Sequence, residues 1–309
     1  MKKCNYNLIF TLFLCLLVGL SGCAEKSVSS NRDAEKTLSS LNVTPIQFGV
    51  LGDGNSIDNH KVLFSKASLT KVDPNTEVFV SYTPTPISVE KLVKKLNICQ
   101  KRQTESRVVY ENDTLSLDVY PNGNFCLFSK EQEAEIMPIT ISDEACVEIA
   151  NAFLLENGLL CDDLVLSKTI GQDKVVGEEG TVIIGKVITY HPKTISGASL
   201  FGNSKVSVRV SAEGLVTELI YNHLHYNNEE VFVLLDPKEA FEQAREQKNP
   251  TAIYFEALDE VPKELTVENV RIAYYENVMS EVPSRQPVYI LEGGSGETQF
   301  AISVSAIKQ

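Results

Sequence analysis

Two histidines offer the clearest chemistry in the chain. His223 and His225 are separated by one residue, in a segment whose alternation predicts a strand. Side chains at alternate strand positions point to the same face, so two imidazoles at this spacing can share a metal ion. The neighbouring asparagines are poor ligands, and Glu229 and Glu230 are expected in the loop that follows. We therefore interpret the pair as an exposed polar strand face, and we expect no metal and no cofactor.

A second pattern points to a nucleophilic serine. Ser68-Leu-Thr-Lys71 matches the S-x-x-K motif of penicillin-binding enzymes, in which the lysine assists the serine. Those enzymes also carry S-D-N and K-T-G motifs, and the chain contains neither, since Ile195 follows Lys193 and Thr194. Common residues also reach this spacing by chance. We expect no catalytic residues and no enzymatic activity, and an envelope hydrolase is the weakest alternative.

The cysteines beyond the N-terminal segment are Cys99, Cys126, Cys146 and Cys161. An even number permits two disulfides, with three possible connectivities. None has the C-x-x-C spacing of a redox or zinc motif. Cys146 is expected on the apolar face of a helix and Cys126 within a strand. We favour free, buried thiols that pack as small hydrophobic side chains over disulfides.

The N-terminus has the layout of a secretory signal. Lys2 and Lys3 precede an apolar run over 8–20, which at about 1.5 Å per residue is too short for a ~30 Å hydrocarbon core. Leu20-Ser-Gly-Cys23 then matches the bacterial lipobox, in which a peptidase cuts before the cysteine and its thiol carries diacylglycerol. We predict a signal peptide over 1–22 and lipid on Cys23. The anchor holds the mature protein on the extracytoplasmic face of the cell membrane.

The charge of the mature chain argues against several partners. Loss of Lys2 and Lys3 leaves 26 basic residues against 41 acidic ones, a net charge of −15. An acidic surface repels phosphate backbones and anionic headgroups. We therefore expect no nucleic-acid partner, and we expect the lipid to hold the protein at the membrane without help from a basic patch. Residues 23–45 are polar, serine-rich and aperiodic, which predicts a flexible tether.

Three amphipathic helices are predicted in the body, each after a residue whose side chain can cap the first turn. The caps are Ser88, Ser142 and Asp236, and Gly158 is placed to end the second helix. Apolar residues recur on one face of each helix, as Val89, Leu92, Val93 and Leu96; as Cys146, Ile149, Ala150 and Phe153; and as Ala240, Phe241 and Ala244.

Strands are predicted between the helices, and one hairpin pattern recurs. Residues 205–211 alternate with period two, Gly214 suits the left-handed turn position, and 215–221 returns. Residues 115–123 align without a gap on 206–214. A third instance combines 271–275 and 287–291 with a turn at Gly293-Gly-Ser-Gly296 and a strand over 300–304.

This pattern predicts an α+β fold of repeated helix-plus-antiparallel-sheet units (αβββ), in which each helix covers the apolar face of its sheet. We place an N-terminal α+β domain at 46–135 and a C-terminal α+β domain with two units at 136–309. The alternative is coincidence, because many α+β proteins contain hairpins with glycine turns.

The arrangement resembles the PepSY-like modules of bacterial secreted proteins and the YycH/YycI regulators of a Gram-positive cell-wall sensor kinase. The resemblance covers 87–309 and rests on a capped helix, strands and a V-x-V-x-x-x-G-x-V hairpin over Val208–Val216. Such modules are linked to peptidase inhibition and to control of envelope signalling. The resemblance therefore implies regulation by binding an envelope protein, with no catalytic residue to carry over. Those kinase regulators are usually tethered by a transmembrane helix, whereas this chain carries a lipobox.

Two functions of different classes follow. The first is a binding or regulatory module for an envelope protein. The alternative is a receptor for a small envelope ligand such as a peptide or wall fragment, which requires a concave pocket with convergent polar groups.

Overall fold

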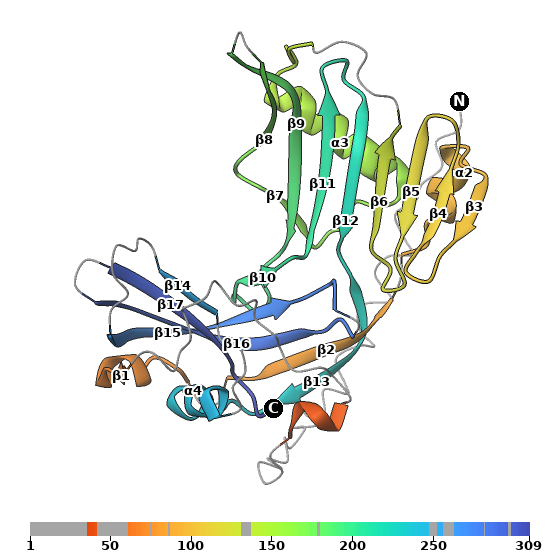
Figure 1. Cartoon of the computed structure of the whole chain (residues 1–309). Coiled ribbons are helices and arrows are strands. Elements are labelled where there is room, and N and C mark those ends of the chain that lie inside the picture. The colour runs from red at the N-terminus through yellow and green to blue at the C-terminus, as the bar shows by residue number, and fades with distance from the viewer. Residues whose placement is uncertain are drawn as a thin grey trace, which may run out of the picture. The chain divides into compact units, whose positions relative to one another are not determined.

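A computed structural model describes residues 36–41, 61–73, 76–85, 87–130, 137–177, 180–246, 252–255, 263–280, 282–295 and 298–309. The expected α+β class is confirmed, because the described chain consists mostly of strands in two sheets, with few and short helices (Figure 1). Cys23 and the expected signal peptide lie outside the described residues, as does most of the tether. Among the helices of the described residues, none has the length and apolar character needed to cross a membrane.

The larger sheet has nine antiparallel strands in the order β3-β4-β5-β6-β12-β11-β9-β7, with β8 also paired to β9. The strands of its first half are β3 (Gln100–Gln103), β4 (Val108–Glu111), β5 (Leu115–Val119) and β6 (Phe125–Ser129). Those of its second half are β7 (Leu164–Leu166), β8 (Gly171–Gly177), β9 (Gly180–Pro192), β11 (Lys205–Ser211) and β12 (Val216–Asn222).

The smaller sheet has eight strands and is centred on β15, β16 and β17. Two of its strands, β1 and β10, pair with β15 in parallel, and the other pairs are antiparallel. Its members are β1 (Lys61–Phe64), β2 (Val78–Thr85), β10 (Leu200–Gly202), β13 (His225–Phe232), β14 (Ala252–Phe255), β15 (Glu264–Glu276), β16 (Arg285–Ser295) and β17 (Thr298–Ser305).

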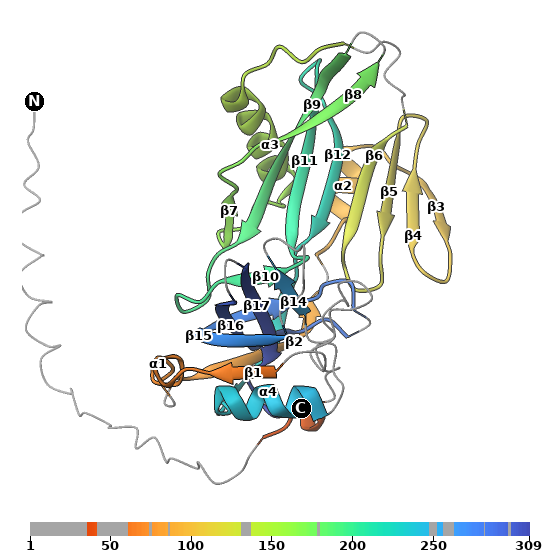
Figure 2. The same ribbon diagram turned by 60° about the vertical axis from the view of Figure 1, so that its left-hand side comes forward.

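Helices cover one face of the larger sheet. Both α2 (Glu90–Lys95) and α3 (Asp143–Asn157) pack on it, and Figure 2 shows α3 along β9, β11 and β12. The core beneath them includes a row of residues paired across neighbouring strands: Leu117, Leu127, Leu219, Val208 and Ile188. We call this helix-covered side the inner face of the sheet.

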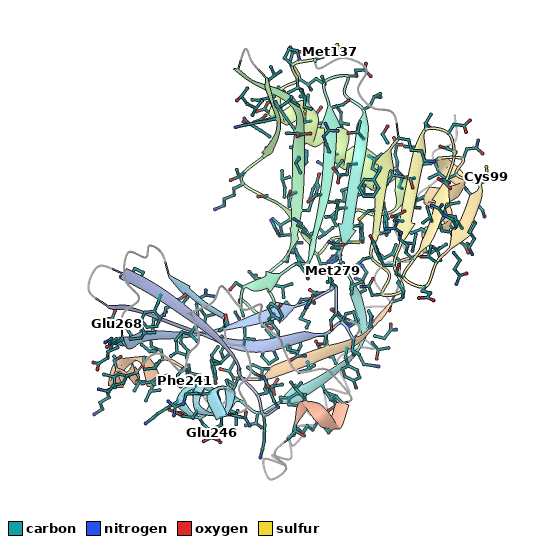
Figure 3. All side chains as sticks on the ribbon, viewed as in Figure 1. Cys99, Met137, Phe241, Glu246, Glu268 and Met279 are labelled. Atoms are coloured by element: carbon teal, nitrogen blue, oxygen red, sulfur yellow. The ribbon has the colours of Figure 1, made fainter. Side chains whose placement is uncertain are left out.

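A separate core lies under α4 (Pro237–Glu246) on the smaller sheet. Phe241 points from α4 into this core, where it is 1% exposed and its ring packs edge-on against Phe64 (Figure 3). The Tyr289 hydroxyl donates to the carbonyl of Leu235 just before the helix, at 2.7 Å. The short segments η1 (Leu38–Leu41) and α1 (Lys66–Leu69) complete the helical elements of the described chain.

The expected caps are confirmed for two helices and wrong for one. Ser142 accepts from the amide of Ala145 at 3.2 Å, and α3 ends at Gly158 with φ of 69°. Asp236 accepts from the amides of the first turn of α4, the closest being Lys238 at 2.9 Å. Ser88 lies one residue too early, because Val89 occupies the N-cap position of α2. The apolar stripes of all three helices do face the cores.

Two of the expected hairpins have turns of the same geometry. Gly123 and Gly214 have φ of 91° and 75°, and each donates its amide to the carbonyl three residues earlier, Tyr120 or Ser211, at 2.9 and 3.0 Å. A left-handed residue at this position is the reason for glycine. The turn expected over Gly293–Gly296 begins later than expected, because β16 continues to Ser295 and β17 begins at Thr298.

Gly293 lies within β16, where it allows the backbone of this strand to approach that of β15 closely. A Cβ atom there would lie 2.0 Å from the carbonyl oxygen of Thr266 on β15. The glycine therefore lets two strands approach at an irregular pairing between Val267 and Asn269. A run of glycines predicts both situations equally, which explains the error.

Strands from both sides of residue 135 pair within each sheet. In the larger sheet β6 pairs with β12, and in the smaller sheet β2 pairs with β13. The segments 46–135 and 136–309 therefore share both sheets. The chain passes from the larger to the smaller sheet between β9 and β10 and again between β12 and β13, the second time at residues 223 and 224.

Candidate functional site

The two histidines lie where the chain changes sheets. His223 is in the link after β12, and His225 is the first residue of β13. Their rings are 5.0 Å apart and nearly perpendicular, with an interplanar angle of 78°. His223 is 0% exposed, so the expected exposed strand face is wrong for this residue, although His225 is exposed. The link between sheets buries His223 together with Leu224, which sequence alternation could not show.

Glu229 and Glu230 also differ from the expectation. Both lie within β13, where they pair with Ser81 and Val80 of β2, instead of in a following loop. Glu229 lies in the middle of β13, and its carboxylate lies 3.5 Å from the Ser81 hydroxyl.

A second segment brings a cysteine and an aspartate to the histidines. Cys161 and Asp163 lie in the connection between α3 and β7. Leu159 and Leu164, on either side of them, are buried in the core of the larger sheet. The amide of Leu164 also donates to the carbonyl of Cys161 at 3.1 Å. The connection is therefore held at both ends and presents its polar side chains in defined positions.

Cys161 completes a cluster of three side chains with metal-binding atoms. Its Sγ is 3.5 Å from Nε2 of His225 and 3.5 Å from the hydroxyl of Tyr221. One such atom from each of Cys161, His223 and His225 lies within 4.8 Å of the other two. Sequence reasoning missed Cys161 because it is far from the histidines along the chain and has no characteristic spacing to them.

Asp163 contacts one ring nitrogen of His223, the Nε2 atom. Oδ2 of Asp163 and Nε2 of His223 are 3.0 Å apart. This hydrogen bond is the main cause that lowers the pKa of the Asp163 carboxyl, against an opposing effect of burial. The other ring nitrogen, Nδ1 of His223, is buried and has no hydrogen-bond partner among the described residues. Burial, and next the hydrogen bond with Cys161, raise the pKa of Tyr221.

A polar pocket of about 340 Å³ adjoins the cluster. Asp163 and His225 line one part of it, and its other lining residues include Ser81, Asn228, Glu229 and Arg285. A pocket of this size with converging polar groups can hold a small polar molecule.

A buried ion pair supports the pocket. Glu276 is 0% exposed, accepts from the Tyr226 hydroxyl at 2.8 Å and pairs with Arg285 at 3.3 Å. The Arg285 guanidinium also lies 5.3 Å from the centre of the Tyr226 ring. Burial is the largest cause that raises the pKa of Tyr226. These contacts fix the orientation of Arg285, and the buried carboxylate of Glu276 balances its positive charge.

Ser68 and Lys71 are each engaged by other partners. Ser68 is buried, and its hydroxyl donates to the carbonyl of Ser65 at 2.7 Å. The Lys71 ammonium donates to the side-chain oxygen of Asn269 at 2.9 Å. Ser68 and Lys71 therefore both have structural contacts, around the C-terminal end of α1.

The four described cysteines are free thiols, as favoured over disulfides. Cys146 is buried on the sheet-facing side of α3, while Cys126 and Cys161 are half-buried. Cys99 is exposed at the surface after α2, so the expectation of burial is wrong there (Figure 3). Burial raises the pKa of the Cys126 thiol to about 11.

The larger sheet has a second, outer face. Because strand residues alternate, the neighbours of the inner core row point away from α2 and α3. The pairing aligns a mixed row on this side: Val109, Asp118, Cys126, Ile220, Ser207 and Thr189. Phe128, 37% exposed, lies beside it between Ser116 and Glu218.

No protein-family model matches the chain, and no curated protein shows significant sequence similarity to it.

Proposed function

We propose that the chain is an extracytoplasmic lipoprotein, anchored through Cys23, whose body regulates an envelope protein by binding it. The observation that carries this proposal is the outer face of the nine-stranded sheet, which combines apolar and polar side chains. Both helices that pack on this sheet in the described part of the chain lie on the inner face. In this proposal the protein performs no chemistry of its own.

The outer face has the breadth and composition of a protein-binding surface. The mixed row crosses the strands from β4 to β9, which at ~4.8 Å between neighbouring strands is roughly 24 Å. Hydrogen-bonded strands give it a backbone that is already ordered before binding, which reduces the entropic cost of association. Ile220 and Phe128 supply apolar area, and Glu218 supplies charge for specificity. Val109 and Asp118 are only 2% and 9% exposed, and the Asp118 carboxylate pairs with Arg107 at 3.0 Å, so neither adds much to the accessible surface.

The proposed fold of this surface is a pair of PepSY-like units placed edge to edge. The first unit runs from α2 to β6, the second from α3 to β12, and β6 pairs with β12. The equivalent turns at Gly123 and Gly214 support this interpretation. The proposed third unit, from α4 to β17, differs in strand order, because β14 pairs with β17.

A pulldown with matched variants tests the proposal. The full-length lipoprotein is captured from detergent-solubilised membranes of its own organism. We expect a stoichiometric partner, whose recovery falls at least about tenfold with Phe128→Asp, because a charge is placed in the centre of the interface. Leu155→Asp is the control, since Leu155 is a 67% exposed apolar residue on α3. Recovery of no stoichiometric partner, or equal loss with both variants, contradicts the proposal.

The polar pocket supports a second candidate, a receptor for a small peptide or wall fragment. Its volume of about 340 Å³ and its converging polar groups meet the requirement stated for such a receptor. A ligand that binds only the folded state raises Tm by mass action. In a thermal-shift screen of short peptides and wall fragments, we expect a hit to lose its effect with Glu229→Gln but not with the outer-face variant Phe128→Asp. A screen without hits contradicts this candidate alone.

A further inference from the structure

We propose that Cys161, His223 and His225 form a binding site for a zinc-class cation, with Asp163 orienting His223. The inference rests on the cluster and does not depend on the proposed binding function. It also differs from the sequence-based expectation of no metal, because the thiol is brought to the histidines only in the folded chain.

The ligand set suits zinc. Thiolate and imidazole are both preferred ligands of Zn²⁺, and a zinc ion held by three protein ligands keeps its fourth position open. Tetrahedral coordination with Zn–S of ~2.3 Å and Zn–N of ~2.0 Å places sulfur and nitrogen about 3.5 Å apart. Sγ of Cys161 and Nε2 of His225 are separated by 3.5 Å. The third ligand atom, from His223, already lies within 4.8 Å of the other two, so only a small movement is needed to complete the site.

His223 supplies the observation that points most directly to a ligand. Its side chain is 0% exposed, and its Nδ1 atom is buried without a hydrogen-bond partner among the described residues. Buried polar atoms normally have partners. Because Nε2 faces the carboxylate of Asp163 at 3.0 Å, the proton belongs on Nε2 and the lone pair on Nδ1. Nδ1 is therefore the atom that can bind a metal.

Asp163 has the role that carboxylates commonly take behind metal-bound histidines. A carboxylate that accepts from the distal ring nitrogen fixes the tautomer and the orientation of the ring. Asp163 is itself held by a connection anchored through Leu159 and Leu164. It also lines the pocket, as does His225, so an open coordination position on this side has access to a small ligand.

A thiol–imidazole nucleophile is the competing interpretation of the pair formed by Cys161 and His225. That pair alone would need the base to be oriented by a third group. The carboxylate instead contacts the other histidine, His223, and leaves its second nitrogen free. A metal uses all of these groups, whereas a nucleophilic pair leaves His223 and Asp163 without a role.

Equilibrium dialysis of the full-length, detergent-solubilised lipoprotein against Zn²⁺ under reducing conditions tests the site. We expect one bound zinc per chain by elemental mass spectrometry. Cys161→Ser and His225→Ala should each weaken binding by at least tenfold, and Asp163→Asn by about 10–100-fold. Co²⁺ should show thiolate-to-metal charge transfer in the wild type but not in Cys161→Ser.

Two control variants make the result specific. Cys99→Ser and His191→Ala remove an exposed thiol and an exposed imidazole elsewhere, and each should retain wild-type affinity. Circular dichroism of every variant separates loss of the ligand from loss of the fold. The proposal is overturned if the wild type binds no zinc, if folded Cys161→Ser and His225→Ala bind as tightly as the wild type, or if the controls lose binding equally.

Discussion

At the scale of residues, identical side chains differ in chemistry because their surroundings differ. The thiol of Cys126 is half-buried in β6 near Asp118 and Glu218, and its pKa is raised to about 11, mainly by burial. The thiol of Cys146 is buried, and its pKa is raised for the same main reason. Cys99 is exposed.

We therefore predict that iodoacetamide alkylates Cys99 much faster than Cys126 or Cys146 near neutral pH. The thiolate is the reactive form, so a raised pKa leaves less of it at any pH below that value. The rate at Cys126 should increase with pH up to about 11. Peptide mapping by mass spectrometry gives the rates, with Cys99→Ser as the control. Equal rates at Cys99 and Cys126 near neutral pH would refute the predicted order.

The proposed lipid anchor also depends on a single residue. We predict that Cys23→Ser abolishes lipidation, because a hydroxyl is far less nucleophilic near neutral pH than a thiol. The variant should remain on its uncleaved signal or, if another peptidase cuts it, leave the membrane. Metabolic labelling with a clickable fatty acid should mark the wild type only. Equal labelling of the variant, or an unlabelled wild type beginning at Met1, would disprove lipidation.

At the scale of elements, two serines with similar sequence contexts play different parts. Ser142 accepts the amide of Ala145 at 3.2 Å as the N-cap of α3. Ser88 precedes the N-cap of α2, and its oxygen lies 3.4 Å from the Glu90 amide nitrogen. The longer α3 also covers more of the sheet.

We predict that Ser142→Ala lowers the free energy of unfolding by about 1 kcal/mol, a typical loss for an N-cap side chain. Ser88→Ala serves as the matched control and should cost less than half as much. Chemical denaturation followed by circular dichroism gives both values. An equal loss from the two substitutions would contradict the assigned helix starts.

At the scale of the whole molecule, both sheets are assembled from distant parts of the chain. The pairs β6–β12 and β2–β13 each join the segment before residue 135 to the segment after it. Separation would expose long, unpaired strand edges, and such edges promote aggregation.

We accordingly predict that residues 46–135 and 136–309 do not fold when produced separately. Each fragment should show little cooperative unfolding and should aggregate, whereas an uninterrupted chain lacking residues 1–34 should unfold cooperatively. Circular dichroism and size-exclusion chromatography provide the measurements. Two monomeric, cooperatively unfolding fragments would show that the shared sheets are not required.

The local features of this fold follow from short-range patterns. Ser142 and Asp236 cap helices because their side chains can accept amides of the following turn, whatever the rest of the chain does. Gly214 occupies a left-handed turn between two alternating strands, and this preference is also local. The apolar stripes of α3 and α4 identified the faces that these helices turn towards the cores.

The arrangement of these elements depends on pairings that no local pattern encodes. Gly293 could be a turn or a close approach, and only the position of Thr266 on the neighbouring strand distinguishes them. His223 is buried because the chain changes sheets at that residue. Cys161 and Asp163 reach it because their connection is anchored in the core by Leu159 and Leu164. Composition and periodicity describe one segment at a time, whereas the cluster exists because long-range packing places two segments together.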